Sequence, residues 1–257
     1  MNAPAVRADV ALVERGLVRS RALAQRLIES GAVDLLDGTR RSAITRVAQP
    51  IRADQQLQVR PSPESRFVSR GGAKLDAVLA EVGLDCTGVV ALDVGMSTGG
   101  FTDCLLARGA SRVIGIEVGH GQLDRRLATD ARVACLEKTH LRDVTLASLA
   151  PAGALPTGFA LIVVDLSFIS ALSVLLHLAT LAAPGARLVV LIKPQFELGP
   201  GARDGRGIVR AGADIEALRR RAIAEAAAAG WRADEWRVCA IAGGDGNQEY
   251  FLVATRT

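Results

Sequence analysis

Three lysines stand out in a chain that otherwise takes its positive charge from arginine. Lys74, Lys138 and Lys193 are the only lysines among 31 basic residues. Arginine keeps its proton at any accessible pH, whereas a desolvated lysine can lose its proton and act as a base. We therefore expect lysine to be retained where proton transfer needs an amine, although three lysines could also survive by chance.

A glycine-rich segment follows the first strongly apolar run, and its spacing favours a nucleoside ligand. The glycines after Asp93 are spaced G-x-x-x-G-G, whereas G-x-G-x-x-G would bring a dinucleotide pyrophosphate against a helix, so an NAD-dependent dehydrogenase is disfavoured. Glu117 ends the next predicted strand, where a carboxylate can accept hydrogen bonds from both ribose hydroxyls. The alternative for Glu117 is a solvent-facing strand end. The candidate nucleoside-binding residues are Asp93, Gly95, Ser97, Thr98, Gly99, Gly100, Phe101 and Glu117.

The elements that must position these residues alternate between strand and helix. Apolar strands are predicted at 89–95, 112–119, 132–138, 161–167 and 187–196, and such strands imply a sheet covered on both faces. That is the doubly wound, mostly parallel α/β fold, in which ligands bind beyond the carboxyl ends of the strands. A helix over 211–229 and two final strands, 236–244 and 249–256, follow; this antiparallel ending resembles the Rossmann-like methyltransferase sheet.

The N-terminal quarter carries all of the excess positive charge. Residues 1–60 hold ten arginines and six acidic residues, whereas the basic and acidic residues of 61–257 balance. A helix from Asp9, a second helix capped by Ser20 and ended by Gly31, and strands near 33–36 and 56–60 predict a small α+β domain. Prolines and a Gly71-Gly72 turn predict a linker at 61–72, which leaves 73–257 as the large domain.

This N-terminal segment is similar to the αL RNA-binding module of a small-subunit ribosomal protein, some pseudouridine synthases and tyrosyl-tRNA synthetases. The similarity covers RADVALVERGLVRSRALAQRLIESGAVDLLDG. It implies binding of structured RNA, which arginine forks and a helix N-terminus can contact through phosphates. A solvated helical face is the alternative. The candidate RNA-binding residues are Arg7, Arg19, Arg21, Gln25, Arg26, Arg40 and Arg41.

Composition argues against export, membrane insertion and a structural metal. No stretch of eighteen residues lacks both charge and turn signals, and no apolar segment follows a basic start. The four cysteines are scattered, with no C-x-x-C pair or nearby histidine set, which fits a reducing compartment and disfavours a zinc site. We therefore expect a cytoplasmic protein that has no membrane partner and no metal.

The large domain resembles the TlyA family of ribosomal RNA methyltransferases, whose members often carry the name hemolysin. The shared motifs are LDVGMSTGGFTDCLL, VGHGQL, VVDLSFIS, LIKPQFE and GNQEYFL. The resemblance implies an FtsJ-like catalytic domain with S-adenosylmethionine as methyl donor, S-adenosylhomocysteine as product, and ribosomal RNA or a ribosomal subunit as partner. It also implies a Lys-Asp-Lys-Glu tetrad for ribose 2′-O-methylation, which maps by motif onto Lys74, Asp165, Lys193 and Glu249, with Asp165 also close to the donor.

The same resemblance suggests a cytidine as the target. Family members without a C-terminal extension tend to act on the large subunit alone. The chain stops soon after Glu249, so the resemblance favours large-subunit over small-subunit RNA. The sequence departs from the family at His140, where asparagine is expected, so the adenine side of the donor pocket is left open. The alternative function is a non-catalytic RNA-binding or ribosome-binding assembly factor; a membrane-lytic role is disfavoured because no suitable amphipathic segment is present.

The chemistry of the four residues follows from the reaction. A ribose hydroxyl needs a base, and we expect Lys193 to be that base, with the ammonium of Lys74 and the sulfonium charge lowering the pKa of Lys193. We expect Asp165 and Glu249 to balance this positive charge and to orient the lysines and the ribose. The alternatives are a solvent-exposed Lys74 at a helix start and an Asp165 that caps a strand end.

Overall fold

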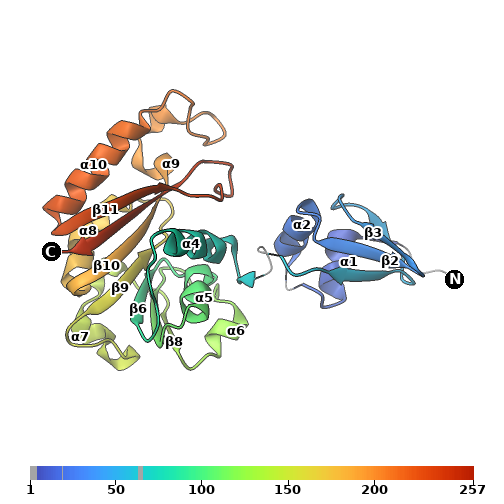
Figure 1. Cartoon of the computed structure of the whole chain (residues 1–257), viewed down its shortest axis with the longest axis horizontal. Coiled ribbons are helices and arrows are strands. Elements are labelled where there is room, and N and C mark those ends of the chain that lie inside the picture. Colours follow the sequence, from blue (N-terminus) through green and yellow to red (C-terminus); the bar gives the residue numbers. More distant parts are fainter. Residues whose placement is uncertain (1–4, 19, 63–65) are drawn as a thin grey trace. The chain divides into compact units, whose positions relative to one another are not determined.

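The computed structural model describes residues 5–18, 20–62 and 66–257, and the chain divides into two compact units, Met1–Ser69 and Arg70–Thr257 (Figure 1). Each unit has its own elements and its own apolar core. Helix α4, Arg70–Glu81, opens the large unit.

The large unit begins at Arg70 rather than at the expected residue 73. Helix α4 includes Gly71 and Gly72, so the predicted turn at these glycines was wrong. A glycine inside a helix costs about 1 kcal/mol relative to alanine. Burial of Leu75 and Leu79 on one face of α4 offsets that cost, because each fully buried leucine stabilises by about 1.5–3 kcal/mol.

The described residues of the small unit include helices α1 and α2 and two small sheets. Ser20 caps the second helix by accepting a hydrogen bond from the Leu23 amide, and Gly31 follows that helix with a φ of 70°, so both predicted helix boundaries are confirmed. Leu12, Leu27 and Ile28 are fully buried in its core. The sheets have the orders β3-β2-β5 and β1-β4. The elements are β1 Val6–Arg7, α1 Ala8–Glu14, α2 Arg21–Glu29, β2 Val33–Asp37, β3 Arg40–Ala43, β4 Pro50–Ile51 and β5 Gln56–Val59.

The large unit is built on one seven-stranded sheet with the order β11-β12-β10-β9-β6-β7-β8. The strands are β6 Val90–Val94, β7 Arg112–Ile116, β8 Val133–Leu136, β9 Phe159–Val164, β10 Ala182–Ile192, β11 Trp231–Val238 and β12 Tyr250–Arg256. Strands β8, β7, β6, β9 and β10 are parallel, and β12 is antiparallel to both of its neighbours. The predicted doubly wound methyltransferase-like sheet is therefore confirmed.

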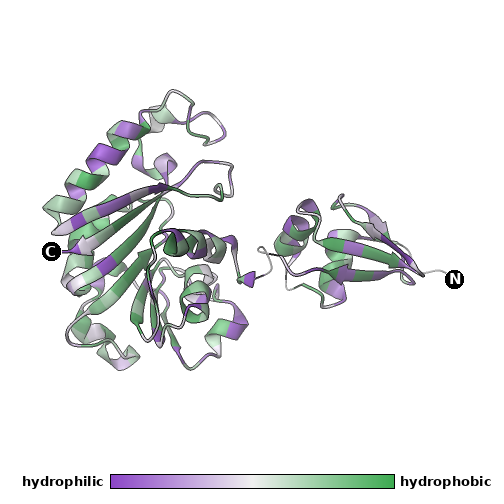
Figure 2. Cartoon of the chain, in the orientation of Figure 1, coloured by the Kyte–Doolittle hydropathy of each residue, from purple (hydrophilic) through white to green (hydrophobic). Residues whose placement is uncertain are grey.

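Helices cover both faces of this sheet, which is why its strands are apolar on both sides (Figures 1 and 2). The larger core cluster joins sheet residues such as Leu92 to side chains of α8 and α10, such as Leu178 and Leu218. Helices α4 and α5 pack together, and α5 reaches β6 through a hydrogen bond from Thr102 to Asp93. The helices are α5 Gly100–Ala107, α6 Arg125–Ala128, α7 Leu146–Leu149, α8 Leu175–Leu181, α9 Pro194–Glu197 and α10 Ile215–Ala228.

Two predicted boundaries near the end of the chain were wrong. Strand β11 begins at Trp231 rather than near residue 236, because polar residues that read as a loop instead form pairs at the sheet edge. Asp234, for example, accepts a hydrogen bond from Thr255 of β12. Helix α10 begins after its cap Asp214, not at 211. Among the residues that the structure describes, none of the helices has the length and apolar character needed to cross a membrane.

Candidate active site

Five strands bring the predicted site residues to one edge of the sheet. Gly95, Glu117, Asp165 and Lys193 each follow a parallel strand, namely β6, β7, β9 and β10. Glu249 comes before β12, but β12 is antiparallel, so its first residue pairs with Ile192 at the end of β10. The chain order reverses between β6 and β9, and ligands of doubly wound sheets bind at such a switch point.

The four tetrad residues form two ion pairs at this edge. The Nζ of Lys74 lies 2.5 Å from Oε2 of Glu249, and both side chains are buried. The Nζ of Lys193 lies 2.6 Å from Oδ1 of Asp165 and also donates to the Ser167 hydroxyl, at 2.9 Å. Each lysine therefore has its own carboxylate. The alternative of a solvent-exposed Lys74 does not hold, because this residue is only 6% exposed.

A cavity of about 560 Å³ opens beside the Lys193–Asp165 pair. This volume is in the range of small-molecule sites, and its wall combines apolar side chains with a few polar groups. Gly95, Ser97, Glu117 and Asp165 of the predicted set line it. The other lining residues are Val94, Ile116, Val118, Gly119, Gln122, Thr139, His140, Leu141, Arg142, Leu166, Ser167, Phe168, Ile169, Ser173 and Val174.

The glycine loop and Glu117 shape this cavity. The Glu117 carboxylate accepts hydrogen bonds from the backbone amides of Ser97, at 2.8 Å, and Gly119, at 2.7 Å. Gly95 has a φ of 85°, and a Cβ atom there would lie 2.5 Å from the Asp165 carbonyl oxygen. Ser97 also has a positive φ, 48°, a conformation typical of strained functional loops. The Glu117 carboxylate, the glycine at position 95 and the volume of the cavity together fit a nucleoside cofactor.

Other residues of the predicted loop lie outside the cavity wall. Phe101 is buried against Phe251, with ring centroids 6.4 Å apart, and Thr98 is exposed. A Cβ on Gly99 would clash with Leu127, and Gly100 is the first residue of α5. None of these four residues lines the cavity, so their predicted contact with a cofactor stays a prediction.

Asp93 is fully buried beneath the loop and accepts a hydrogen bond from the Thr102 hydroxyl at 2.7 Å. Burial raises the pKa of Asp93 to about 7, with the nearby charges of Asp165 and Glu117 adding to the shift. A neutral, protonated Asp93 can donate as well as accept a hydrogen bond. Asp93 is buried and does not line the cavity, so its predicted contact with a cofactor stays a prediction.

Sequence reasoning missed Glu197, which links the loop after Asp165 to helix α10. Its side chain is 1% exposed and accepts hydrogen bonds from the Ser170 hydroxyl at 2.6 Å and the Ala171 amide at 2.7 Å. Arg221 of α10 pairs with it at 3.1 Å. Glu197 lies four residues after Lys193, and Ser170 lies five after Asp165. The signal available was a lone acid in the motif LIKPQFE.

Four of the predicted RNA-binding residues bind two buried carboxylates in the small unit. Asp9 is fully buried and is bonded by Arg7, Arg21 and Gln25 at 3.0, 2.9 and 3.2 Å. These bonds, that of Arg7 first, hold the pKa of Asp9 well below its usual range. About half of the side chain of Arg7 and of Arg21 stays exposed.

The remaining predicted RNA-binding residues lie on strand β3 and helix α2. Arg41 of β3 pairs with the buried Asp34 at 2.6 Å. Arg40 is exposed and Arg26 of α2 is half-buried, whereas Arg19 lies outside the described residues. The structure thus places the described members on one small unit and fixes several of them by ion pairs.

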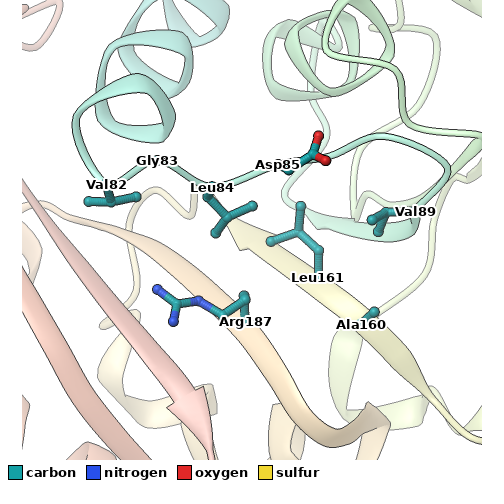
Figure 3. A pocket seen from close by; sticks show the side chains of 8 residues that line it. All are labelled: Val82, Gly83, Leu84, Asp85, Val89, Ala160, Leu161 and Arg187. Atoms are coloured by element: carbon teal, nitrogen blue, oxygen red, sulfur yellow. The ribbon is translucent and has the colours of Figure 1, made fainter.

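A second cavity, of about 310 Å³, lies at the opposite, amino-terminal edge of the sheet (Figure 3). It is lined by residues near the starts of β6, β9 and the paired part of β10, including Leu84 and Leu161. Its charged groups, Arg187 and Asp85, lie on different sides of it. Arg187 already pairs with Asp234 at 3.1 Å, so this cavity brings together no reactive groups.

The four cysteines are free thiols, of which Cys86, Cys104 and Cys239 are buried and Cys135 is half-buried. Burial raises the pKa of Cys135 to about 11, which leaves little reactive thiolate near neutral pH. Across residues 5–18, 20–62 and 66–257, histidine, cysteine and acidic side chains form no group of three or more that could hold a metal.

Comparison with known proteins places this geometry among methyltransferases. The model of the FtsJ-like methyltransferase family matches residues 67–256. The 16S/23S rRNA (cytidine-2′-O)-methyltransferase TlyA of Mycobacterium tuberculosis is 39% identical over 249 residues, 96% of this chain and 88% of the relative. Hemolysin A of Brachyspira hyodysenteriae is 33% identical over 95% of this chain and 98% of the relative. A solved hemolysin-named structure from Streptococcus thermophilus has a TM-score of 0.73 at 32% identity, covering 99% of this chain and 89% of that one.

Proposed function

Because the chain belongs to the TlyA family of FtsJ-like methyltransferases, we propose that it methylates the ribose 2′-hydroxyl of a cytidine in ribosomal RNA, with S-adenosylmethionine as donor. The observation that carries this proposal is the pairing of Lys193, at 2.6 Å, with Asp165, which lines a nucleoside-sized cavity. An enzyme that modifies ribosomal RNA works where ribosomes assemble, so we place it in the cytoplasm.

The cavity residues fit the donor. Bound S-adenosylmethionine would supply an electrophilic methyl group on a sulfonium sulfur. Glu117 would accept hydrogen bonds from the ribose hydroxyls of the donor, since each carboxylate oxygen binds one backbone amide and can accept a second hydrogen bond. Gly95 lets the end of β6 approach the Asp165 backbone closely, because a Cβ atom at Gly95 would collide with the Asp165 carbonyl oxygen.

Proton transfer falls to the two ion pairs. In its neutral amine form, Lys193 would accept the proton of the target hydroxyl at Nζ, which lies beside Asp165 and Ser167 of the cavity wall. Lys74 and Glu249 would orient the same hydroxyl from the other side of the site. Each lysine has one carboxylate partner, so the site carries no excess positive charge even when both lysines are protonated, which supports the predicted charge-balancing roles of Asp165 and Glu249.

Mass-spectrometric mapping of ribose methylation in ribosomal RNA, with and without the protein, tests the reaction and the target together. We expect one or more ribose-methylated cytidines that need the protein. The Lys193→Arg variant keeps the charge but cannot act as a base, so we expect it to bind donor and RNA without methylating. Normal methylation by this variant would remove Lys193 from the role of base.

A further inference from the structure

An arginine-bearing hairpin, residues 203–210, follows α9 and has a defined structure. Arg203 and Val209 form an antiparallel bridge, and the Asp204 amide donates to the Ile208 carbonyl at 2.8 Å. The Asp204 carboxylate accepts hydrogen bonds from the amides of Arg206 and Ile208, both at 2.9 Å. These bonds, that of Ile208 first, lower the pKa of Asp204, so its charge is used to close the turn.

Asn247 ties this hairpin to the segment that carries Glu249. Its side chain accepts a hydrogen bond from the Val209 amide at 2.8 Å and donates to the Gly207 carbonyl at 3.2 Å. Asn247 is 2% exposed, so water cannot replace these bonds at low cost. In Figure 1 the orange connection before α10 and the red connection before β12 lie on the same side of the large unit.

The same segment holds Glu249 closely. The Gly243 amide donates to the Asn247 carbonyl at 2.8 Å, and a Cβ on Gly243 would lie 2.7 Å from Oε1 of Glu249. A shift of Asn247 would therefore displace both the hairpin and the segment around Glu249. A cavity of about 200 Å³, lined by Pro194 next to Lys193 and by Asn247, also places the hairpin beside the tetrad.

The charge of the hairpin matches an RNA backbone. It carries Arg203, Arg206 and Arg210, and the side chain of Arg206 is 85% exposed. The rest of the large unit has no net positive charge to offer, because the basic and acidic residues after residue 60 balance. Arginine binds phosphate through paired N–H donors, and such contacts supply much of the affinity for RNA.

We propose that this hairpin binds the phosphate backbone of the substrate RNA beside the tetrad, and that Asn247 positions it relative to Glu249. The proposal rests on the proposed function for the identity of the RNA. It assigns the catalytic unit its own RNA contact, separate from the arginines of the small unit.

The test uses the double variant Arg206→Glu/Arg210→Glu in the full chain. Its matched control is Arg219→Glu/Arg220→Glu on α10, which makes the same charge change at two exposed arginines. Binding to purified ribosomal RNA and to ribosomal subunits is measured over a range of salt concentrations. We expect the hairpin variant to bind at least fivefold more weakly than the control, and the slope of log affinity against log salt to fall by about 0.7–0.9 for each phosphate that the variant no longer binds.

Donor binding separates this inference from the proposed function. Both double variants should bind S-adenosylmethionine like the wild type in calorimetry. Equal RNA affinity for the hairpin variant and the control would overturn the inference while leaving methylation by the wild type intact. Absence of methylation by the wild type, with a hairpin-specific loss of RNA binding, would instead reject the proposed function alone.

Asn247 is tested as a positioning residue. Asn247→Ala should weaken RNA binding and also lower the single-turnover rate of methylation at saturating RNA. Asn247→Asp keeps the acceptor for the Val209 amide, so it should recover part of both losses. Loss of RNA affinity with an unchanged saturating rate would show that Asn247 does not couple the hairpin to Glu249.

Discussion

Removing the Glu197 carboxylate should loosen the site without touching any reacting group. In Glu197→Ala the Ala171 amide and the Ser170 hydroxyl lose their acceptor, and Arg221 loses its ion pair with residue 197. A buried donor left without a partner costs about 1–3 kcal/mol. Arg221 is 43% exposed, so screening limits its loss to about 1 kcal/mol or less. We expect a total loss of about 2–5 kcal/mol in the free energy of unfolding, because the Ala171 amide is buried whereas the half-buried Ser170 hydroxyl can bind water instead.

The glutamine variant should behave differently. In Glu197→Gln the side-chain oxygen can still accept from the Ala171 amide, and its NH₂ group can donate to the Ser170 hydroxyl oxygen. Only the pair with Arg221 is lost, so we expect a loss of about 1 kcal/mol or less. Urea unfolding at pH 7 measures both values.

Function should follow the same order. Ser167 and Ser173, which line the cavity, flank the segment that Glu197 holds. We expect Glu197→Ala to raise the Kd for S-adenosylmethionine at least tenfold and to lower the single-turnover methylation rate, with a smaller effect in Glu197→Gln. Calorimetry and single-turnover assays provide these values.

A matched control is Glu225→Ala. Glu225 pairs with the same Arg221 at 3.5 Å but is 45% exposed, so its loss should change the free energy of unfolding by about 0.5 kcal/mol or less. The reasoning fails if Glu197→Ala unfolds within 1 kcal/mol of the wild type, or if the glutamine and alanine variants are equally unstable.

Three further predictions concern residues on both units. Because burial raises the pKa of Asp93 to about 7, its stabilising contribution is fully present below about pH 4 and is lost as pH rises through 7. The difference in unfolding free energy between wild type and Asp93→Asn should therefore fall by up to about 1.4 kcal/mol per pH unit in this window; a flat difference in urea titrations would contradict this. Gly95→Ala should raise the Kd for S-adenosylmethionine in calorimetry at least tenfold, whereas Gly246→Ala, with a similar φ but open space around it, should not. Asp9→Asn should weaken binding to ribosomal RNA in gel-shift assays at unchanged donor affinity, because Arg7 and Arg21 lose their shared carboxylate.

The mostly parallel sheet and the edge that carries the site could be predicted from the sequence. The apolar runs before Asp93 and Asp165 are long enough to require a sheet buried on both faces, and such a sheet collects its strand ends at one edge. The position of Glu117 followed from the same argument, and the structure places it on the cavity wall.

Which lysine pairs with which carboxylate could not be predicted. Lys74 and Glu249 are 175 residues apart in sequence, and their contact depends on β12 being inserted next to β10. Glu197 was missed for a similar reason, since its partners come from another loop and from α10. Local patterns report the burial of a face, whereas ion pairs between distant segments depend on the completed sheet.

The position of β12 inside the sheet also sets the order in which a newly made chain can acquire its parts. Strand β11 is synthesised before β12, which is its only neighbour among the described strands of the sheet. It therefore cannot pair until β12 has left the ribosome. The small unit, by contrast, is complete by Ser69 and can fold while the large unit is still being translated. A nascent chain can therefore have its small unit folded well before Glu249 is synthesised and pairs with Lys74.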